Sequence, residues 1–195
     1  MASKLLAEEI AVELEELAMP NAQISFEIVS ADFENSKSYQ SLGLDEVNMN
    51  FRSHPSAKWS PLAKSASGGE LSRVMLALEV VLSRLSSVGT FIFDEVDAGV
   101  GGKAAMEVGR KLAHIARNSQ VIVITHLAQV AVWAEKHFVV EKNENGNVSE
   151  SSVFEVKGAR REVEIARLLS GQADSNSAQE HAAELLTLAS KSMIS

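Results

Sequence analysis

Two short apolar runs with a helical pattern between them constrain the fold of this chain most strongly. The runs cover residues 91–93 and 121–124, and residues 103–117 between them have helical spacing. Strands that alternate with helices indicate an α/β sheet with parallel members. Short, continuously apolar runs are typical of strands buried on both faces of such a sheet. We therefore expect an α/β fold, with a largely parallel sheet of buried strands flanked by helices.

The rest of the chain divides into further helices, strands and loops. Helical spacing of apolar residues predicts helices over residues 4–18, from Gly68 to Leu85, and over 127–134, 161–169 and 178–189. Alternating residues predict strands over 22–30 and 46–53, and the pair Asn145 and Gly146 predicts a hairpin of strands 138–141 and 148–156. We expect loops over 34–41 and 54–67.

Composition excludes several classes of protein. The 195 residues are 46% hydrophobic and carry a net charge of -8, which fits a globular domain and argues against a self-sufficient nucleic-acid binder. Lys103, Arg110, Lys111 and Arg117 fall on one predicted helix, which we interpret as a solvated face; the alternative is a local basic patch. The chain has no Cys, no run of about 18 apolar residues and an acidic N-terminus, so we expect a cytoplasmic protein without a membrane segment.

Polar side chains follow both apolar runs. Asp94 and Glu95 follow the first run and His126 follows the second, and ligands of parallel sheets lie at these carboxyl ends. In phosphoryl transfer, one carboxylate can hold Mg²⁺ and the next can polarise the attacking water. His126 could hydrogen-bond a phosphate or that water. The alternatives are a strand that ends in solvated acids and a satisfied loop histidine, whereas a metal-ligating histidine would need a second ligand at useful spacing.

Residues 65–73 begin the helix that contains Gly68, and they allow two compatible interpretations. Ser67 and Glu70 have the spacing of a capping box. That interpretation leaves Gly68 and Gly69 unexplained, since each costs up to about 1 kcal/mol against Ala inside a helix. Glycines here would let an anion reach the N–H groups at the positive end of the helix. We therefore predict a phosphate site at residues 67–69.

The sequence lacks the motif that grips phosphates in P-loop proteins. No G-x-x-x-x-G-K-S/T occurs in it. Gly102 and Lys103 do not form one, because Asp97 stands where the first Gly is needed and Ala104 replaces the Ser or Thr. The glycines at positions 99, 101 and 102 instead suit a tight turn.

The ordered set of motifs resembles the C-terminal lobe of ABC ATPase heads of the SMC type. More closely, it resembles the C-terminal end of the RecN family of bacterial DNA-repair proteins, over about residues 17–186. The segments that carry the resemblance are residues 61–73 (PLAKSASGGELSR), 91–97 (FIFDEVD), 125–131 (THLAQVA) and 164–171 (EIARLLSG).

The resemblance implies a role for each residue of the set. Ser67, Gly68, Gly69 and Glu70 would form the signature motif, which contacts the γ-phosphate of ATP bound to a second head. Asp94 would hold Mg²⁺, Glu95 would be the catalytic base and His126 the γ-phosphate switch. Asp97 would belong to the loop that crosses the dimer interface, although the Ser frequent in that loop is absent from residues 99–102.

The resemblance also implies a domain organisation and partners. Residues 1–19 would end a coiled coil that leads into the head, and residues 20–195 would be the C-terminal lobe. The partners would be the N-terminal P-loop lobe of the same protein, a second head in a homodimer, and DNA in the nucleoid through the full-length protein. ATP and Mg²⁺ would bind tightly only with the P-loop lobe, so we expect a fragment or half of a split head that is inactive alone.

Two other functions remain open from the sequence. A structural chromosome-organising protein of the SMC type could use the same lobe as a nucleotide-gated dimerisation module without hydrolysis, although Glu95 would then have no purpose. A self-contained Mg²⁺-dependent phosphoesterase could use Asp94, Glu95 and His126, but it would leave residues 67–69 unexplained.

Overall fold

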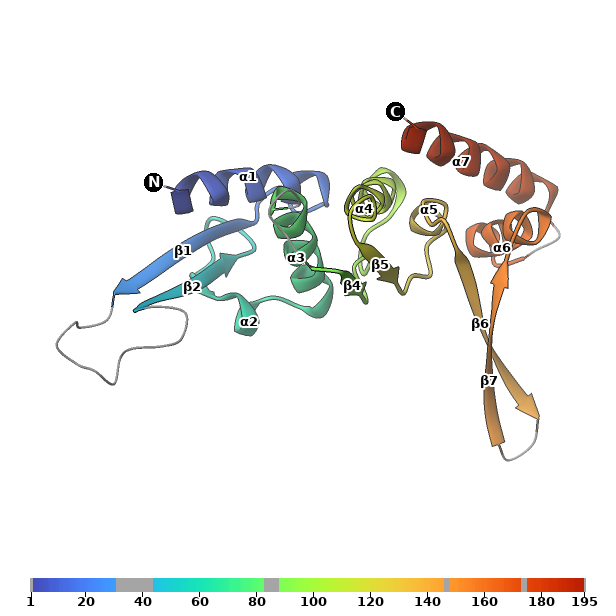
Figure 1. Ribbon diagram of the computed structural model, residues 1–195, viewed down its shortest axis with the longest axis horizontal. Helices are drawn as coiled ribbons and strands as arrows, with labels where there is room; N and C mark the ends of the chain where they lie inside the picture. The colour runs from blue at the N-terminus through green and yellow to red at the C-terminus, as the bar shows by residue number, and fades with distance from the viewer. Residues whose placement is uncertain (1, 31–43, 83–87, 146–147, 173–174, 195) are drawn as a thin grey trace. The chain divides into compact units, whose positions relative to one another are not determined.

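The computed structural model describes residues 2–30, 44–82, 88–145, 148–172 and 175–194. It divides into two compact units (Figure 1). Unit 1 comprises Met1–Val88 with Asp94–Gly99, and unit 2 comprises Gly89–Phe93 with Val100–Ser195. The chain thus enters unit 2 at Gly89 and returns to unit 1 at Asp94, which is followed by Glu95.

Unit 1 contains a small antiparallel sheet, with one helix packed against it and a second helix packed against the first. Its elements are α1 (Ala2–Glu16), β1 (Gln23–Ser30), β2 (Asp45–Arg52), β3 (Ser60–Pro61), α2 (Leu62–Ser65) and α3 (Gly68–Leu82). The strand order is β1-β2-β3, and both pairs are antiparallel. The helix α1 lies against β1 and α3 (Figure 1).

The core of unit 1 follows from the apolar periodicity of its elements. Ile10, Leu14 and Leu17 recur on one face of α1 and its end, and all three are fully buried. Phe51 of β2 and Val74 of α3 complete this core. The apolar stripe of each helix thus faces the sheet or the other helix, as an amphipathic pattern requires.

The predicted loop over residues 54–67 is wrong in part, because it contains β3 and α2. Ser60 pairs with Phe51 and Pro61 pairs with Asn50, both in β2. No local pattern marks these residues as a strand, and Pro is tolerated only because β3 is an edge strand. The other helices and strands predicted for unit 1 are confirmed within a few residues, while Leu85 and residues 34–41 lie outside the described residues.

Unit 2 contains the two apolar runs and the C-terminal elements. They are β4 (Thr90–Phe93), α4 (Gly102–Ile115), β5 (Gln120–Val123), α5 (Ala128–Ala131), β6 (His137–Asn145), β7 (Val148–Val156), α6 (Ala159–Ser170) and α7 (Asn176–Ile194). The strands β4 and β5 are parallel, and β6 and β7 form an antiparallel hairpin. The predicted α/β fold with a hairpin and C-terminal helices is confirmed. Instead of one largely parallel sheet, the described strands form three small sheets, of which β4-β5 is the parallel pair. Gly146 lies outside the described residues.

Small side chains let α5, α6 and α7 pack closely in unit 2. The buried cluster contains Ala128, Ala131, Val132, Trp133, Ile165, Ala166, Ala178, Ala182 and Ala189. Trp133, at the end of α5, also reaches α4, where a Cβ on Gly109 would overlap its indole ring. Gly109 therefore allows α4 and the α5 segment to approach each other.

The strands β4 and β5 are less buried than their sequences predict. Ile92, Ile122 and Ile124 are exposed at 68%, 44% and 55%. Ile92 and Ile122 are directly paired, and Ile124 follows Ile122 with the same orientation, so these three side chains share one side of the sheet, the isoleucine face. The prediction of strands buried on both faces is wrong here, since no described element of unit 2 covers this face.

Candidate functional site

The capping box at the start of α3 is present. The Ser67 N–H donates to Glu70 Oε2 at 2.9 Å, and the Glu70 N–H donates to Ser67 Oγ at 3.3 Å. These reciprocal bonds satisfy the N–H groups of Ser67 and Glu70. Gly68 and Gly69 lie between them and begin the helix, and the capping box does not involve their N–H groups.

The structure gives Gly68 and Gly69 a packing role. A Cβ on Gly68 would lie 2.8 Å from Glu95 Oε2. A Cβ on Gly69 would lie 2.9 Å from Ala98 Cβ and 3.1 Å from the carbonyl oxygen of Glu95. Gly69 thus allows the backbone of the segment after β4 to lie against the first turn of α3, and Gly68 leaves room for the Glu95 side chain. The phosphate contact of residues 67–69 stays a prediction, in addition to this packing role.

Ser72 and Arg73 of α3 hold residues 94–98, the acidic segment, in place. The sequence analysis did not give either side chain a role. Ser72 Oγ donates to the Asp94 carbonyl oxygen at 2.8 Å, and Arg73 Nη1 donates to the Ala98 carbonyl oxygen at 2.7 Å. Arg73 is buried, and desolvation lowers the pKa of its guanidinium, with a smaller opposing effect from Glu70. The one signal in the sequence that could have identified Arg73 is its position, because it is a charged residue next to the apolar stripe of the predicted helix.

The acidic segment presents carboxylates with different surroundings. Asp94 and Glu95 are exposed, whereas Asp97 is 2% exposed. Glu95 has φ of 56°, in the left-handed region that non-glycine residues rarely adopt. The Ala98 N–H donates to the Glu95 carbonyl oxygen at 3.0 Å, which closes a turn around Val96. The backbone therefore turns sharply at Glu95, and such outliers are commonly found at functional sites.

His126 lies in unit 2, in the turn between β5 and α5. The Leu127 N–H donates to Thr125 Oγ1 at 3.0 Å, so the Thr125 side chain closes the turn around His126. The His126 side chain is exposed. Its predicted action together with Asp94 and Glu95 of unit 1 stays a prediction.

The predicted solvated basic face of α4 is wrong for one residue. Lys111 is 3% exposed and packs inside unit 2. Arg110 Nε lies 2.7 Å from Glu107 Oε2, so this guanidinium forms an ion pair with an acid of the same helix. Lys103 and Arg117 are exposed near opposite ends of the helix. The described part of α4 therefore carries no continuous basic surface that would attract nucleic acid.

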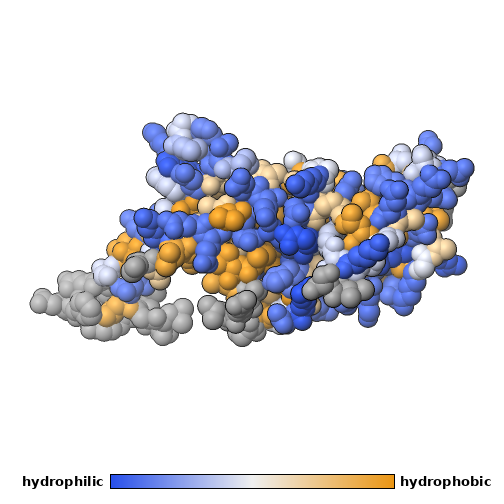
Figure 2. Space-filling view, turned by 90° about the horizontal axis from the view of Figure 1, so that it is seen from above, coloured by the Kyte–Doolittle hydropathy of each residue, from blue (hydrophilic) through white to orange (hydrophobic). Residues whose placement is uncertain are grey.

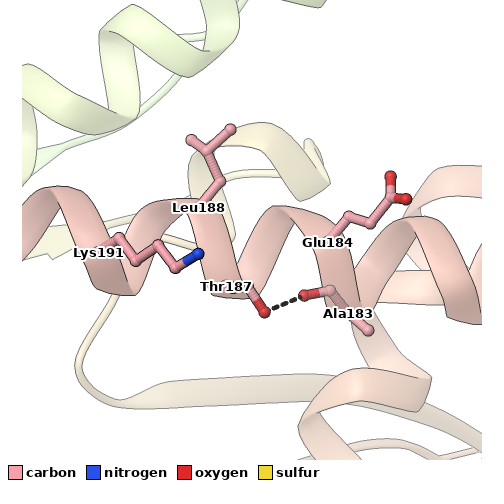
Figure 3. A pocket seen from close by; sticks show the side chains of 5 residues that line it. All are labelled: Ala183, Glu184, Thr187, Leu188 and Lys191. Carbon is pink, nitrogen blue, oxygen red and sulfur yellow. Dashed lines mark hydrogen bonds between the residues drawn. The ribbon is translucent and has the colours of Figure 1, made fainter.

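Other kinds of site are not evident in the described part of the chain. It contains no group of three or more His, Cys, Asp or Glu side chains that could hold a metal ion by themselves. A hollow on α7 is lined by Ala183, Glu184, Thr187, Leu188 and Lys191 (Figure 3). All five lie on one helix, and Thr187 Oγ1 already donates to the Ala183 carbonyl oxygen at 2.8 Å. This hollow is a feature of the helix surface, remote in sequence from the predicted site residues.

The face of the molecule seen from above is mixed in polarity (Figure 2). Figure 2 shows hydrophobic areas among hydrophilic residues. No described helix combines the length and the apolar character needed to cross a membrane.

Comparison with known proteins identifies the relatives of this chain. No family model matches it. The DNA repair protein RecN of Streptomyces coelicolor is 48% identical over 195 residues, which cover 96% of this chain and 34% of that protein. RecN of Deinococcus radiodurans is 43% identical over 93% of this chain and 31% of its own length, and RecN of Treponema pallidum is 41% identical over 89% and 30%.

A solved structure supports the fold. The Smc head domain with a coiled coil and joint from Pyrococcus yayanosii matches with a TM-score of 0.55 and 18% identity, over 86% of this chain and 29% of that one. This likeness places the fold among SMC-type head domains. The chain spans about a third of the length of the curated relatives that it matches. On the strength of the sequence identities over nearly all of its length, the chain belongs to the RecN family.

Proposed function

We propose that this chain is the C-terminal lobe of an SMC-type ATPase head that acts in the recombinational repair of DNA double-strand breaks. The observation that carries the proposal is the packing of the signature segment against the acidic segment in unit 1. Ser72 Oγ binds the Asp94 carbonyl oxygen, and the Glu95 carboxylate lies at Gly68. Relatives named DNA repair protein RecN, up to 48% identical, supply the biological process.

The start of α3 fits the phosphate of a nucleotide. The capping box leaves the N–H groups of Gly68 and Gly69 outside its own bonds, at the positive end of the helix, which favours an anion. We propose that Ser67, Gly68 and Gly69 contact the γ-phosphate of ATP held by a second head. Glu70 supports them by holding the Ser67 N–H. We also propose that Asp97, whose side chain is buried, belongs to the loop that crosses to the second head.

The acidic segment and His126 supply the remaining chemistry. ATP supplies a phosphoryl group whose transfer to water is limited mainly by positioning and charge. Asp94 is proposed to hold Mg²⁺, Glu95 to accept the proton of the attacking water, and His126 to hydrogen-bond the γ-phosphate. The left-handed backbone at Glu95 interrupts the regular path of the chain directly after Asp94, which supports separate roles for the two residues.

The isoleucine face indicates where the rest of the head would dock. Parallel strands are normally covered on both faces, and a sheet of two strands is marginal alone. The exposed Ile92, Ile122 and Ile124 therefore support a covering partner, which we propose is the N-terminal P-loop lobe of the same protein. In the same proposal, residues 1–19 end a coiled coil, DNA binds the full-length protein, and the protein works on the nucleoid in the cytoplasm.

Replacement of Glu95 in the full-length protein tests this function. Glu95→Gln keeps the size of the side chain but removes the charge that activates water, so ATP turnover should fall by about 10²–10⁴-fold. ATP-bound dimers should accumulate in the variant, as measured by size-exclusion chromatography with light scattering. Glu9→Gln, an exposed acid on α1, is the matched control and should leave both measurements unchanged.

The outcomes separate the candidate functions. This chain alone should hydrolyse ATP negligibly, because it lacks a P-loop. Turnover by the isolated chain that Glu95→Gln abolishes would instead support a self-contained phosphoesterase. Unchanged turnover in the full-length Glu95→Gln variant would remove Glu95 from the mechanism.

A further inference from the structure

We propose that Arg161 of α6 is a positioning residue for His126, through the α5 segment that follows His126. Its Nη2 group donates to the carbonyl oxygens of Val132 and Ala134 at 3.1 and 2.7 Å. A longer contact of 3.3 Å reaches the carbonyl oxygen of Ala131. One side chain thus holds the end of a helical segment that lies about 30 residues earlier in the chain. This inference rests on the proposed role of His126.

The segment of residues 125–134 is anchored at its start and its end. At the start, Thr125 Oγ1 accepts the Leu127 N–H and fixes the turn around His126. At the end, Trp133 packs on Gly109, and the Arg161 guanidinium binds the terminal carbonyl groups. Because α5 is only Ala128–Ala131, a shift of its end moves the whole segment. The position of His126 therefore depends on Arg161.

The environment of Arg161 suits this role. The last carbonyl groups of a helix lack helical partners and carry partial negative charge, so a cation stabilises them. Desolvation lowers the pKa of Arg161, but a guanidinium stays charged at neutral pH. All three contacts come from one nitrogen, Nη2, so a Lys ammonium, which carries the same charge on a single donor nitrogen, can replace part of them. Loss of the guanidinium would leave part-buried carbonyl groups without their donor.

The test measures ATP turnover in the full-length protein for single and double variants. Arg161→Ala should lower kcat about tenfold, with KM for ATP within about twofold, because His126 acts in the hydrolytic step. Arg161→Lys should restore part of kcat. Arg160→Ala removes the neighbouring guanidinium, which is exposed, and should leave kcat unchanged. In the His126→Ala background, Arg161→Ala should cause no further loss, since residues that act as a unit are non-additive.

A second readout does not depend on turnover. Hydrogen exchange of residues 127–134 in the nucleotide-free protein should accelerate in Arg161→Ala and stay unchanged in Arg160→Ala. Additive effects of Arg161→Ala and His126→Ala on kcat, or unchanged exchange in Arg161→Ala, would overturn the positioning role. If His126→Ala itself leaves kcat unchanged, the proposed function of His126 fails, and the inference fails with it.

Discussion

Gly68 and Gly69 are adjacent in one helical turn, and the structure predicts different responses to the same substitution. A Cβ on Gly68 meets only Glu95 Oε2, the end of a flexible and exposed side chain that can rotate away. A Cβ on Gly69 meets Ala98 Cβ and the backbone oxygens of Glu95 and Ala98, at 2.9, 3.1 and 3.4 Å. These atoms belong to the loop of residues 95–98, which Arg73 anchors through the Ala98 carbonyl oxygen, so they can move only if that loop moves.

The magnitudes follow from two opposing effects. Replacement of a glycine by Ala at a compatible backbone conformation stabilises a protein by about 0.4–1 kcal/mol. Neither residue has a positive φ, so both should gain this amount. Overpacking against groups that cannot move costs about 1–3 kcal/mol and should apply to Gly69 alone. Gly68→Ala should therefore be neutral or slightly stabilising. The free energy of unfolding of Gly69→Ala should be lower by up to about 2.6 kcal/mol, the overpacking cost less the gain.

The assay is urea denaturation of the chain, followed by circular dichroism, for the two variants and the parent. For a chain of this size, 1 kcal/mol corresponds to about 2–4 °C in thermal midpoint, so thermal unfolding provides a second measurement. Gly68→Ala is the matched control for Gly69→Ala. Equal effects of the two substitutions, or a larger loss in Gly68→Ala, would refute the reasoning from close approach.

Two further predictions concern Ser67 and His137. Ser67→Arg in the full-length protein should abolish ATP-dependent head association, because a cation at the start of α3 opposes the helix dipole; loss of the cap alone would cost about 0.5–2 kcal/mol in stability and leave association intact. Burial, and next Arg161, lower the pKa of His137 below its usual 6.5, with smaller effects of Glu164 and Arg167. Since the unfolded state then binds more protons, stability should fall as the pH drops from 6.5 to the lowered pKa. His137→Phe should flatten this pH dependence in urea titrations, and the exposed His114→Phe should not; the same slope in both variants would contradict the assignment.

The sequence determined the order and type of most elements and the candidate motifs. Apolar periodicity is a local property, so α1, α3, α4 and the strands β1, β2, β4 and β5 could be predicted within a few residues. The capping box of Ser67 and Glu70 also follows from local spacing, and the structure confirms it.

Only the tertiary structure decided which distant residues hold these motifs in place. The contacts of Ser72 and Arg73 with the acidic segment join residues 22 and 25 positions apart, and those of Arg161 join residues 27–30 positions apart. Likewise, β3 forms because β2 offers an unpaired edge to Ser60 and Pro61. Such contacts depend on the path of the chain in space, which the spacing of residues along the sequence does not encode.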